Sequence, residues 1–147
     1  MAKTRLDTNE KYMEFQQFQA AWILENLSKS KKHDLKNAIV LDLGSGPGGY
    51  TKEIAKNSKF VFPLDLNILN RHKEANILQI KGDAVYLPFR NSSIDFIFCA
   101  SLVEHIQNQS RLLAEIFRVL KTGHTCYLSF PPFYCLLAGI NLNHIIY

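Results

Sequence analysis

The stretch from Leu41 to Thr51, LDLGSGPGGYT, places glycines at positions 44, 46, 48 and 49 directly after a short apolar run. Glycine lacks a Cβ atom and adopts positive φ at little cost, so such a loop lets a ligand come very close to the backbone. The apolar run, Ala38 to Leu43, is typical of a strand buried on both faces and hence of a parallel sheet. The loop therefore predicts a bound cofactor, whose class depends on the residues around it.

The rest of the chain alternates strand and helix patterns. An N-terminal segment, roughly 9–27, carries apolar side chains at helical spacing and predicts an amphipathic helix that docks through one face. Strands followed by helical connections predict a Rossmann-like, doubly wound, mostly parallel α/β sheet. The apolar face of the N-terminal helix comprises Tyr12, Phe15, Phe18, Trp22 and Ile23, and its aromatics are expected in the core. Strands are expected at 38–43, 60–65, 77–80, 94–100 and 125–130, and further helices at 49–56 and 109–120.

Composition narrows the class of protein. The chain has 147 residues, is 47% hydrophobic and 20% charged, and is in the size range of one domain. It has neither the roughly 18-residue apolar run of a membrane span nor the apolar core of a signal peptide, so a cytoplasmic protein is expected. The three cysteines lack CxxC spacing, and no metal site is predicted. The net charge of +4 and the lysine-rich connector 29–36, which lacks arginine and aromatics, make a nucleic-acid surface an unfavoured interpretation.

Three cofactor classes use glycine-rich loops. Gly44 and Gly49 have the separation of the two P-loop glycines, but the lysine that would follow is replaced by Tyr50. Gly44-x-Gly46-x-x-Gly49 also fits a dinucleotide loop, and Asp65 lies near the position of the expected ribose-binding acid. A third spacing, Gly44-x-Gly46-x-Gly48, has Asp42 two residues ahead of it. A carboxylate beside the loop favours a ligand with ammonium and sulfonium charges over a pyrophosphate.

This third pattern resembles motif I of the class I S-adenosylmethionine-dependent methyltransferases, an acid followed by three alternate glycines. Four further stretches resemble segments of the same family in the same order. The resemblance covers about residues 39–130 and points to the small-molecule methyltransferases. The four stretches are KGDAVYLPF from Lys81, SSIDFI from Ser92, LVEHI from Leu102 and LAEIFRVLKTG from Leu113.

The resemblance implies S-adenosylmethionine as the cofactor and assigns roles along the loop. Asp42 would favour the ammonium end of the cofactor, unless it merely caps the loop. The alternate glycines would let the backbone approach the methionine and ribose parts, where side chains would collide with the cofactor. The implied loop residues are Gly44, Ser45, Gly46 and Gly48.

Further roles follow for the ends of the other strands. Asp65 would accept hydrogen bonds from both ribose hydroxyls, and Leu66 would pack on the adenine face. Asp83, with Ala84 beside it, would meet the adenine amino group, unless it is an ordinary turn residue. The methionine part would be bordered by Ala100 and Ser101. His105 is a weak candidate for a catalytic base and is better interpreted as ordering the turn beside Glu104.

Two departures from the family affect these expectations. Pro63 lies within a central strand, so the sheet is expected to be broken or near its end there. The tail 131–147 is too short for the family's sixth and seventh strands, so these are predicted to be missing. The edge of the fifth strand would then be open to self-association or to a partner chain. The expected organisation is a cap helix and connector (1–36), a cofactor-binding core (37–130) and a short tail (131–147).

The predicted activity is methyl transfer to a small-molecule, lipid or glycan acceptor. The alternative is a degenerate or truncated module of the same fold without catalysis. An RNA methyltransferase or an NAD-dependent oxidoreductase is a less favoured interpretation.

Overall fold

The computed structural model describes residues 9–29, 35–130 and 145–146. Its elements alternate between helices and strands. In chain order they are α1 (Asn9–Ser28), β1 (Ile39–Leu43), α2 (Gly49–Ala55), β2 (Phe60–Asp65), β3 (Ile80–Lys81), β4 (Ile94–Ala100), the 3₁₀-helix η1 (Val103–His105), α3 (Gln109–Val119), β5 (Leu120–Ser129) and β6 (Ile145–Ile146).

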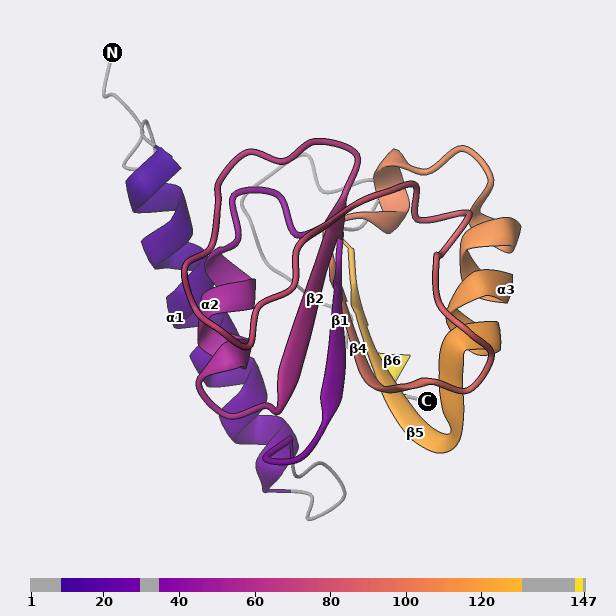
Figure 1. Ribbon diagram of the computed structural model, residues 1–147, viewed down its shortest axis with the longest axis horizontal. Helices are drawn as coiled ribbons and strands as arrows, with labels where there is room; N and C mark the ends of the chain where they lie inside the picture. The colour runs from indigo at the N-terminus through magenta and orange to yellow at the C-terminus, as the bar shows by residue number, and fades with distance from the viewer. Residues whose placement is uncertain (1–8, 30–34, 131–144, 147) are drawn as a thin grey trace.

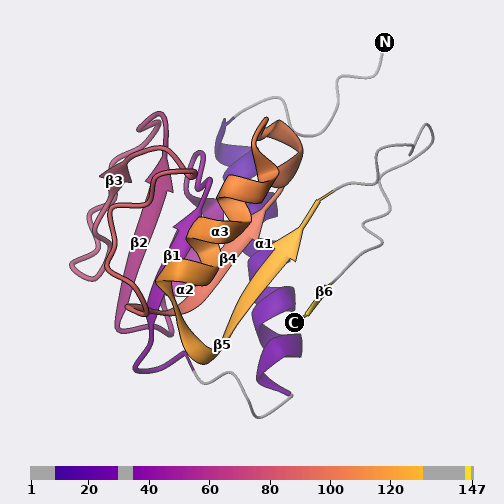
Figure 2. The same cartoon turned by 90° about the vertical axis from the view of Figure 1, so that its right-hand side faces the viewer.

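The strands form one sheet in the order β3-β2-β1-β4-β5-β6. Strands β1 to β5 are parallel, whereas β6 pairs antiparallel with Tyr127 and Leu128 of β5. Helices α1 and α2 lie on one side of the sheet and α3 on the other, as Figures 1 and 2 show. The predicted doubly wound α/β fold with an N-terminal helix is confirmed. The two-residue β6 was not predicted, and the rest of the tail lies outside the described residues.

The core consists of two apolar layers, one on each side of the sheet. Between the sheet and α1 and α2, the ring of Phe98 contacts Tyr50 at a centroid distance of 5.0 Å and stacks on Tyr127 at 4.9 Å. Between the sheet and α3, the buried side chains include Leu41, Leu43, Ile97, Leu112 and Ile116. Val40 of β1 belongs to the first layer, whereas Leu41 and Leu43 belong to the second. Successive residues of β1 thus face opposite layers, as expected for a strand buried on both faces.

The orientation of α1 differs from the sequence prediction. Of the five predicted core residues only Ile23 is buried, and Phe18 and Trp22 are 72% and 54% exposed. The helix instead turns its smaller and polar side chains inward, because it crosses α2 very closely at Gly49. A Cβ atom on Gly49 would lie only 2.5 Å from Cβ of Gln16. The buried residues of α1 are Gln16, Ala20, Ile23 and Leu27.

Pro63 interrupts the sheet on one side, as predicted. Val61 donates to the Asn76 carbonyl and accepts from the Leu78 amide, so its polar groups face β3, and those of Pro63 face the same way. Because proline has no N–H, it cannot donate toward β3. β3 is therefore confined to Ile80–Lys81, where it pairs with Leu64 and Asp65, instead of spanning the expected 77–80.

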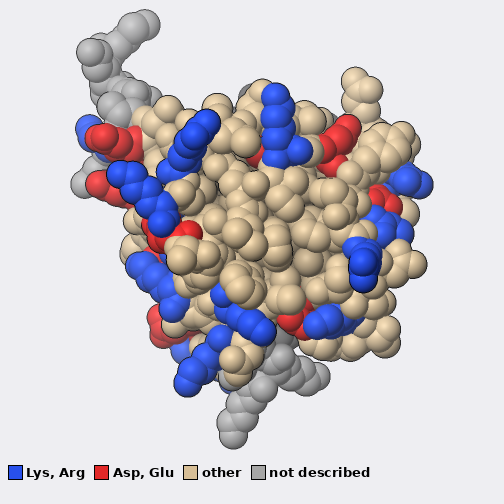
Figure 3. Space-filling view, viewed as in Figure 1, with Lys and Arg blue, Asp and Glu red and all other residues tan. Residues whose placement is uncertain are grey.

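Charges on the molecular surface are mixed. On the face drawn in Figure 3, Lys and Arg side chains are interspersed with acidic ones around a largely uncharged centre. None of the helices in the described part of the chain is both long and apolar enough to cross a bilayer.

Candidate cofactor site at the carboxyl edge of the sheet

The glycine loop lies at the carboxyl edge of the sheet, where it connects β1 to α2. The Leu64 carbonyl accepts hydrogen bonds from the amides of Gly44 (2.9 Å) and Ser45 (3.2 Å), which folds the loop over the end of β2. The amide of Gly46 then donates to Oδ2 of Asp65 at 2.9 Å. The structure thus brings together the loop and the acid that the sequence singled out.

The structure gives different reasons for a glycine at each of the three alternate positions of the loop. All have positive φ, at 76°, 52° and 87° for Gly44, Gly46 and Gly48. A Cβ atom on Gly44 would lie 2.9 Å from Cδ1 of Leu102, and one on Gly48 would lie 2.4 Å from Cε1 of His72. At Gly46, by contrast, a Cβ atom would meet no described atom within 4 Å. At Gly44 and Gly48 the protein itself therefore fills the space that a side chain would need, whereas at Gly46 the space is open. That the loop backbone approaches a cofactor at the three positions stays a prediction.

Side chains from three separate segments hold the loop. Besides Asp65, Asn70 donates from Nδ2 to the Pro47 carbonyl at 2.9 Å, and Oε1 of the buried Gln16 accepts from the Gly49 amide at 3.2 Å. Sequence reasoning missed Gln16, Asn70 and His72. Gln16 is a polar residue on the packed face of α1, and it indicates a loop contact only when that face is already known from the structure.

Asp42 is buried between β1 and α2 instead of facing the loop surface. It is 1% exposed, and Oγ1 of Thr51 donates to its carboxylate at 2.5 Å. Burial raises the pKa of Asp42 to about 7, and the nearby Asp65 raises it too, whereas the hydrogen bond from Thr51 lowers it. Asp42 can therefore act on a ligand through its field, and its charge varies near neutral pH.

The other predicted acids lie along the same edge. Asp65 is half-buried at the end of β2, and its Oδ1 accepts from the Asn67 amide at 3.0 Å. Each carboxylate oxygen has two lone pairs, so Asp65 retains capacity for further donors. Oδ1 of Asp83 accepts from the Val85 amide at 3.0 Å and so orders the turn after β3. Ala84 beside it is buried, whereas Leu66 is 59% exposed.

The segment after β4 has strained backbone. Ala100 is buried, and Ser101 follows with φ 53°, an uncommon value for a residue other than glycine. The amide of Ser101 donates to the Ser129 carbonyl at 2.8 Å, and the next residue, Leu102, packs on Gly44. His105 in η1 is exposed, while Oε2 of Glu104 is buried without a hydrogen-bond partner among the described residues. That His105 orders the turn beside Glu104, and the alternative that it is a catalytic base, both stay predictions.

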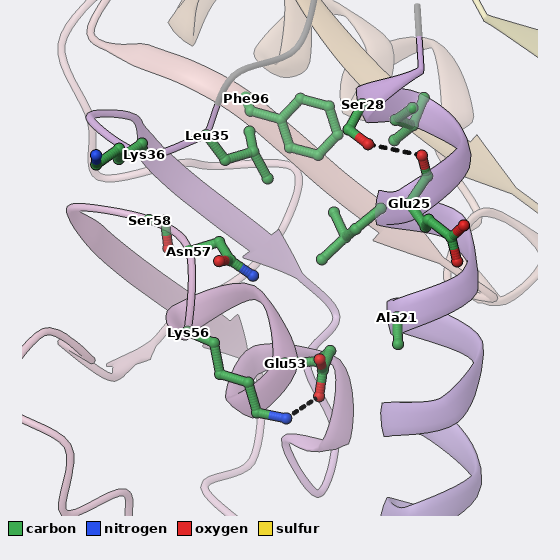
Figure 4. Close-up of a pocket in the computed structure, with 12 residues that line it drawn as sticks. Ala21, Glu25, Ser28, Leu35, Lys36, Glu53, Lys56, Asn57, Ser58 and Phe96 are labelled. Carbon is green, nitrogen blue, oxygen red and sulfur yellow. Dashed lines mark hydrogen bonds and ion pairs between the residues drawn. The ribbon is translucent and has the colours of Figure 1, made fainter.

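Two further features lie outside the loop region. A cavity of about 740 Å³ opens near the amino ends of β1 and β2, where α1, α2 and the residues before β1 meet (Figure 4). Its apolar lining includes Leu24, Leu27 and Phe96, and a Lys56–Glu53 ion pair lies at its rim. Because the glycine loop lies at the opposite edge of the sheet, this cavity is separate from it. Within the described ranges, no three His, Cys, Asp or Glu side chains are grouped so as to hold a metal ion.

Residues 41–128 match the family model described as a methyltransferase domain. The biotin biosynthesis bifunctional protein BioHC of Cellvibrio japonicus is 35% identical over 100 residues, which make up 65% of this chain and 20% of that protein. The ubiquinone/menaquinone biosynthesis C-methyltransferase UbiE of Wigglesworthia glossinidia brevipalpis is 33% identical over 97 residues. The match covers 57% of this chain and 39% of that protein.

The fold has solved counterparts as well. The structure of a SAM-dependent methyltransferase from Aquifex aeolicus superposes with a TM-score of 0.63 at 22% identity, over 73% of this chain and 63% of that one. The chain therefore spans less than half of the two curated relatives and less than two thirds of this structure.

Proposed function

The chain belongs to the methyltransferase domain family, as its sequence predicted, and we propose that it binds S-adenosylmethionine at the glycine loop and transfers its methyl group to an acceptor. The observation that carries this proposal is the hydrogen bond between Gly46 and Asp65. It places a backbone without side chains, a carboxylate with spare lone pairs and free space above Gly46 next to one another. This combination suits a ligand with a ribose and a compact charged end.

The fit of the cofactor rests on this chain's own donors and acceptors. Asp65 would accept from the ribose hydroxyls, and Leu66, exposed directly after it, would offer an apolar surface to the adenine. Asp83 and Ala84 would border the adenine from the turn after β3. Ala100 and Ser101 would border the methionine part from the end of β4. The cofactor supplies the activated methyl group, so these residues need only orient it and exclude water.

Asp42 would contribute electrostatically. A sulfonium and an ammonium near the loop are stabilised by its negative charge, and binding in turn would lower the pKa of Asp42 from about 7. Cofactor binding would then release a proton near neutral pH.

For the acceptor we favour a small molecule, a lipid or a glycan. The support is that relatives of this domain include proteins named for biotin biosynthesis and for ubiquinone and menaquinone biosynthesis. The mixed charge on the face in Figure 3 offers no extended basic surface for RNA. The alternative function is a non-catalytic module with a partner at the outer edge of β5. Its support is that, among the residues that the structure describes, β6 pairs with only Tyr127 and Leu128 of that edge.

Calorimetric titration with S-adenosylhomocysteine tests the proposal. We expect binding by the unaltered chain and a loss of affinity on the order of 10–100-fold in Asp65→Ala, because a hydrogen bond to a charged group is removed. Glu25→Ala is a matched control, since this exposed acid on α1 pairs only with the exposed Lys29 among the ion pairs of the described residues. Absence of binding by a folded chain, or equal binding of NAD, would contradict the proposal.

A further inference from the structure

The connection that follows β2, residues 66–79, lies against the glycine loop. Figure 1 shows the connections after β1 and β2 at the same end of the sheet. Asn70 of this connection contacts both the glycine loop and α1. Its Nδ2 lies 2.9 Å from the Pro47 carbonyl of the loop and 3.3 Å from Sδ of Met13 in α1. The carbonyl of Asn70 is itself held by Nε2 of Gln79 at 2.8 Å. The connection is thus fixed in place and can support the loop.

His72 is the residue of this connection that lies against Gly48. Its side chain is only 3% exposed. Its ring occupies the space that a side chain on Gly48 would need, since an added Cβ atom would lie 2.4 Å from Cε1 and 2.5 Å from Nε2. The imidazole ring therefore packs directly against the loop backbone at Gly48.

The surroundings of His72 suit a neutral ring. Nδ1 is buried and has no hydrogen-bond partner among the described residues, and the carboxylate of Glu74 is 4.0 Å away. Burial lowers the pKa of His72, as does Lys52 of α2, while Glu74 raises it. A protonated ring carries N–H groups on both nitrogens. The buried Nδ1–H would then lack an acceptor, and reaching water or Glu74 would require the ring to move away from Gly48.

We propose that His72 is a positioning residue for the cofactor loop, whose neutral ring against Gly48 holds the loop in the shape that joins Gly46 to Asp65. Protonation of the ring releases the loop and weakens cofactor binding. The inference rests on the proposed function in one respect only, that the loop binds the cofactor. The loop geometry itself is a property of the chain alone.

The first test uses the protein without cofactor. Amide hydrogen-exchange protection factors of Gly46 and Gly49 are measured by NMR at pH 7.5 and pH 5.0. We expect protection in the unaltered chain to fall by about 3–10-fold at pH 5.0 as the imidazole takes up a proton. His72→Phe keeps an aromatic ring that does not titrate, while Asp42 still titrates in both proteins. The fall in protection of His72→Phe should therefore be clearly smaller than that of the unaltered chain. His124→Phe, at the opposite edge of the sheet, should retain the pH dependence.

The second test measures the dissociation constant of S-adenosylhomocysteine for the same variants over the same pH range. The ratio of the constants for the unaltered chain and His72→Phe should be near one at pH 7.5 and rise to about 3–10 at pH 5.0. Titration of Asp42 occurs in both proteins and cancels in this ratio. Parallel pH profiles in both tests would overturn the inference and leave His72 as a packing residue.

The two tests also separate this inference from the proposed function. A chain that binds no S-adenosylhomocysteine at pH 7.5 would contradict the proposed function, while the exchange data still decide the role of His72. His72→Ala adds a check on packing. We expect it to lower loop protection at both pH values, and unchanged protection at pH 7.5 would also overturn the inference.

Discussion

Arg118 donates two hydrogen bonds to Glu115 one turn before it in α3, at 2.8 and 2.7 Å. Each partner also holds the segment after β3. Glu115 accepts from the Leu87 amide at 2.7 Å, and Arg118 donates to the carbonyls of Phe89 and Leu87 at 2.8 and 3.0 Å. This pair therefore attaches the segment that follows the Asp83 turn to α3, at Leu87 and Phe89.

Glu115→Gln should destabilise the fold in a pH-dependent way. The hydrogen bonds from Arg118 lower the pKa of Glu115 from 4.5 to about 2. A lowered carboxyl pKa means that the folded state binds fewer protons than the unfolded state, so the stabilisation is present above pH 4.5 and lost as pH falls toward 2. We expect a loss on the order of 2–3 kcal/mol in the free energy of unfolding at pH 7, from urea titration. The loss should shrink at pH 3, and an equal loss at both pH values would contradict the assignment.

Asp42→Asn should have the opposite effect. The pKa of Asp42 is raised from 3.8 to about 7, so the folded state binds more protons than the unfolded one between these values, and stability falls as pH rises through that window. The amide removes the buried charge and can still accept from Thr51. We expect Asp42→Asn to be more stable than the unaltered chain at pH 8, by on the order of 1–3 kcal/mol, with little difference at pH 4. Urea unfolding at both pH values measures this, and a less stable variant at pH 8 would disprove it.

Gly46→Ala and Gly48→Ala should have different main effects, the first on ligand binding and the second on the stability of the fold. Both place a non-glycine residue at positive φ, at a cost of about 1–2 kcal/mol. Gly48→Ala must in addition displace His72, so its melting temperature should fall further than that of Gly46→Ala. Gly46→Ala intrudes only on free space and should weaken S-adenosylhomocysteine binding more than its stability loss explains. Thermal unfolding and calorimetry on the two variants check this, and a larger melting-temperature loss in Gly46→Ala would contradict it.

The orientation of α1 predicts unequal costs for truncating its apolar residues. Ile23 is 8% exposed and Phe18 is 72% exposed. Ile23→Ala should cost about 2–5 kcal/mol in the free energy of unfolding, whereas Phe18→Ala should stay within about 0.5 kcal/mol. If Phe18→Ala cost as much as Ile23→Ala in urea unfolding, the aromatic face predicted from the sequence would be the buried one after all.

The sequence predicted the fold well where a pattern is local. Three local patterns were enough to predict the parallel sheet: the apolar run of β1, the glycines after it and the alternation of strand and helix patterns. Pro63 correctly indicated a break in the sheet. The sequence prediction failed where close packing decides, as at α1, because Gly49 of α2 packs against Gln16 and the aromatics stay outside that contact. β5 begins at Leu120 and not at 125, since Leu120 already pairs with Ile94 of β4. Asp65 was predicted from its spacing, whereas Asn70 and His72 are long-range partners without a local pattern.

The shape of the glycine loop is determined largely from outside the loop. Gln16, Asn70 and His72 belong to segments far from it in sequence, and each contacts a different loop residue. Substitutions at these three positions can therefore adjust affinity and exchange rate of the bound molecule while the glycine motif stays unaltered. Two chains with identical glycine motifs can then differ widely in how tightly they retain the same cofactor, and the motif alone is a poor guide to that difference.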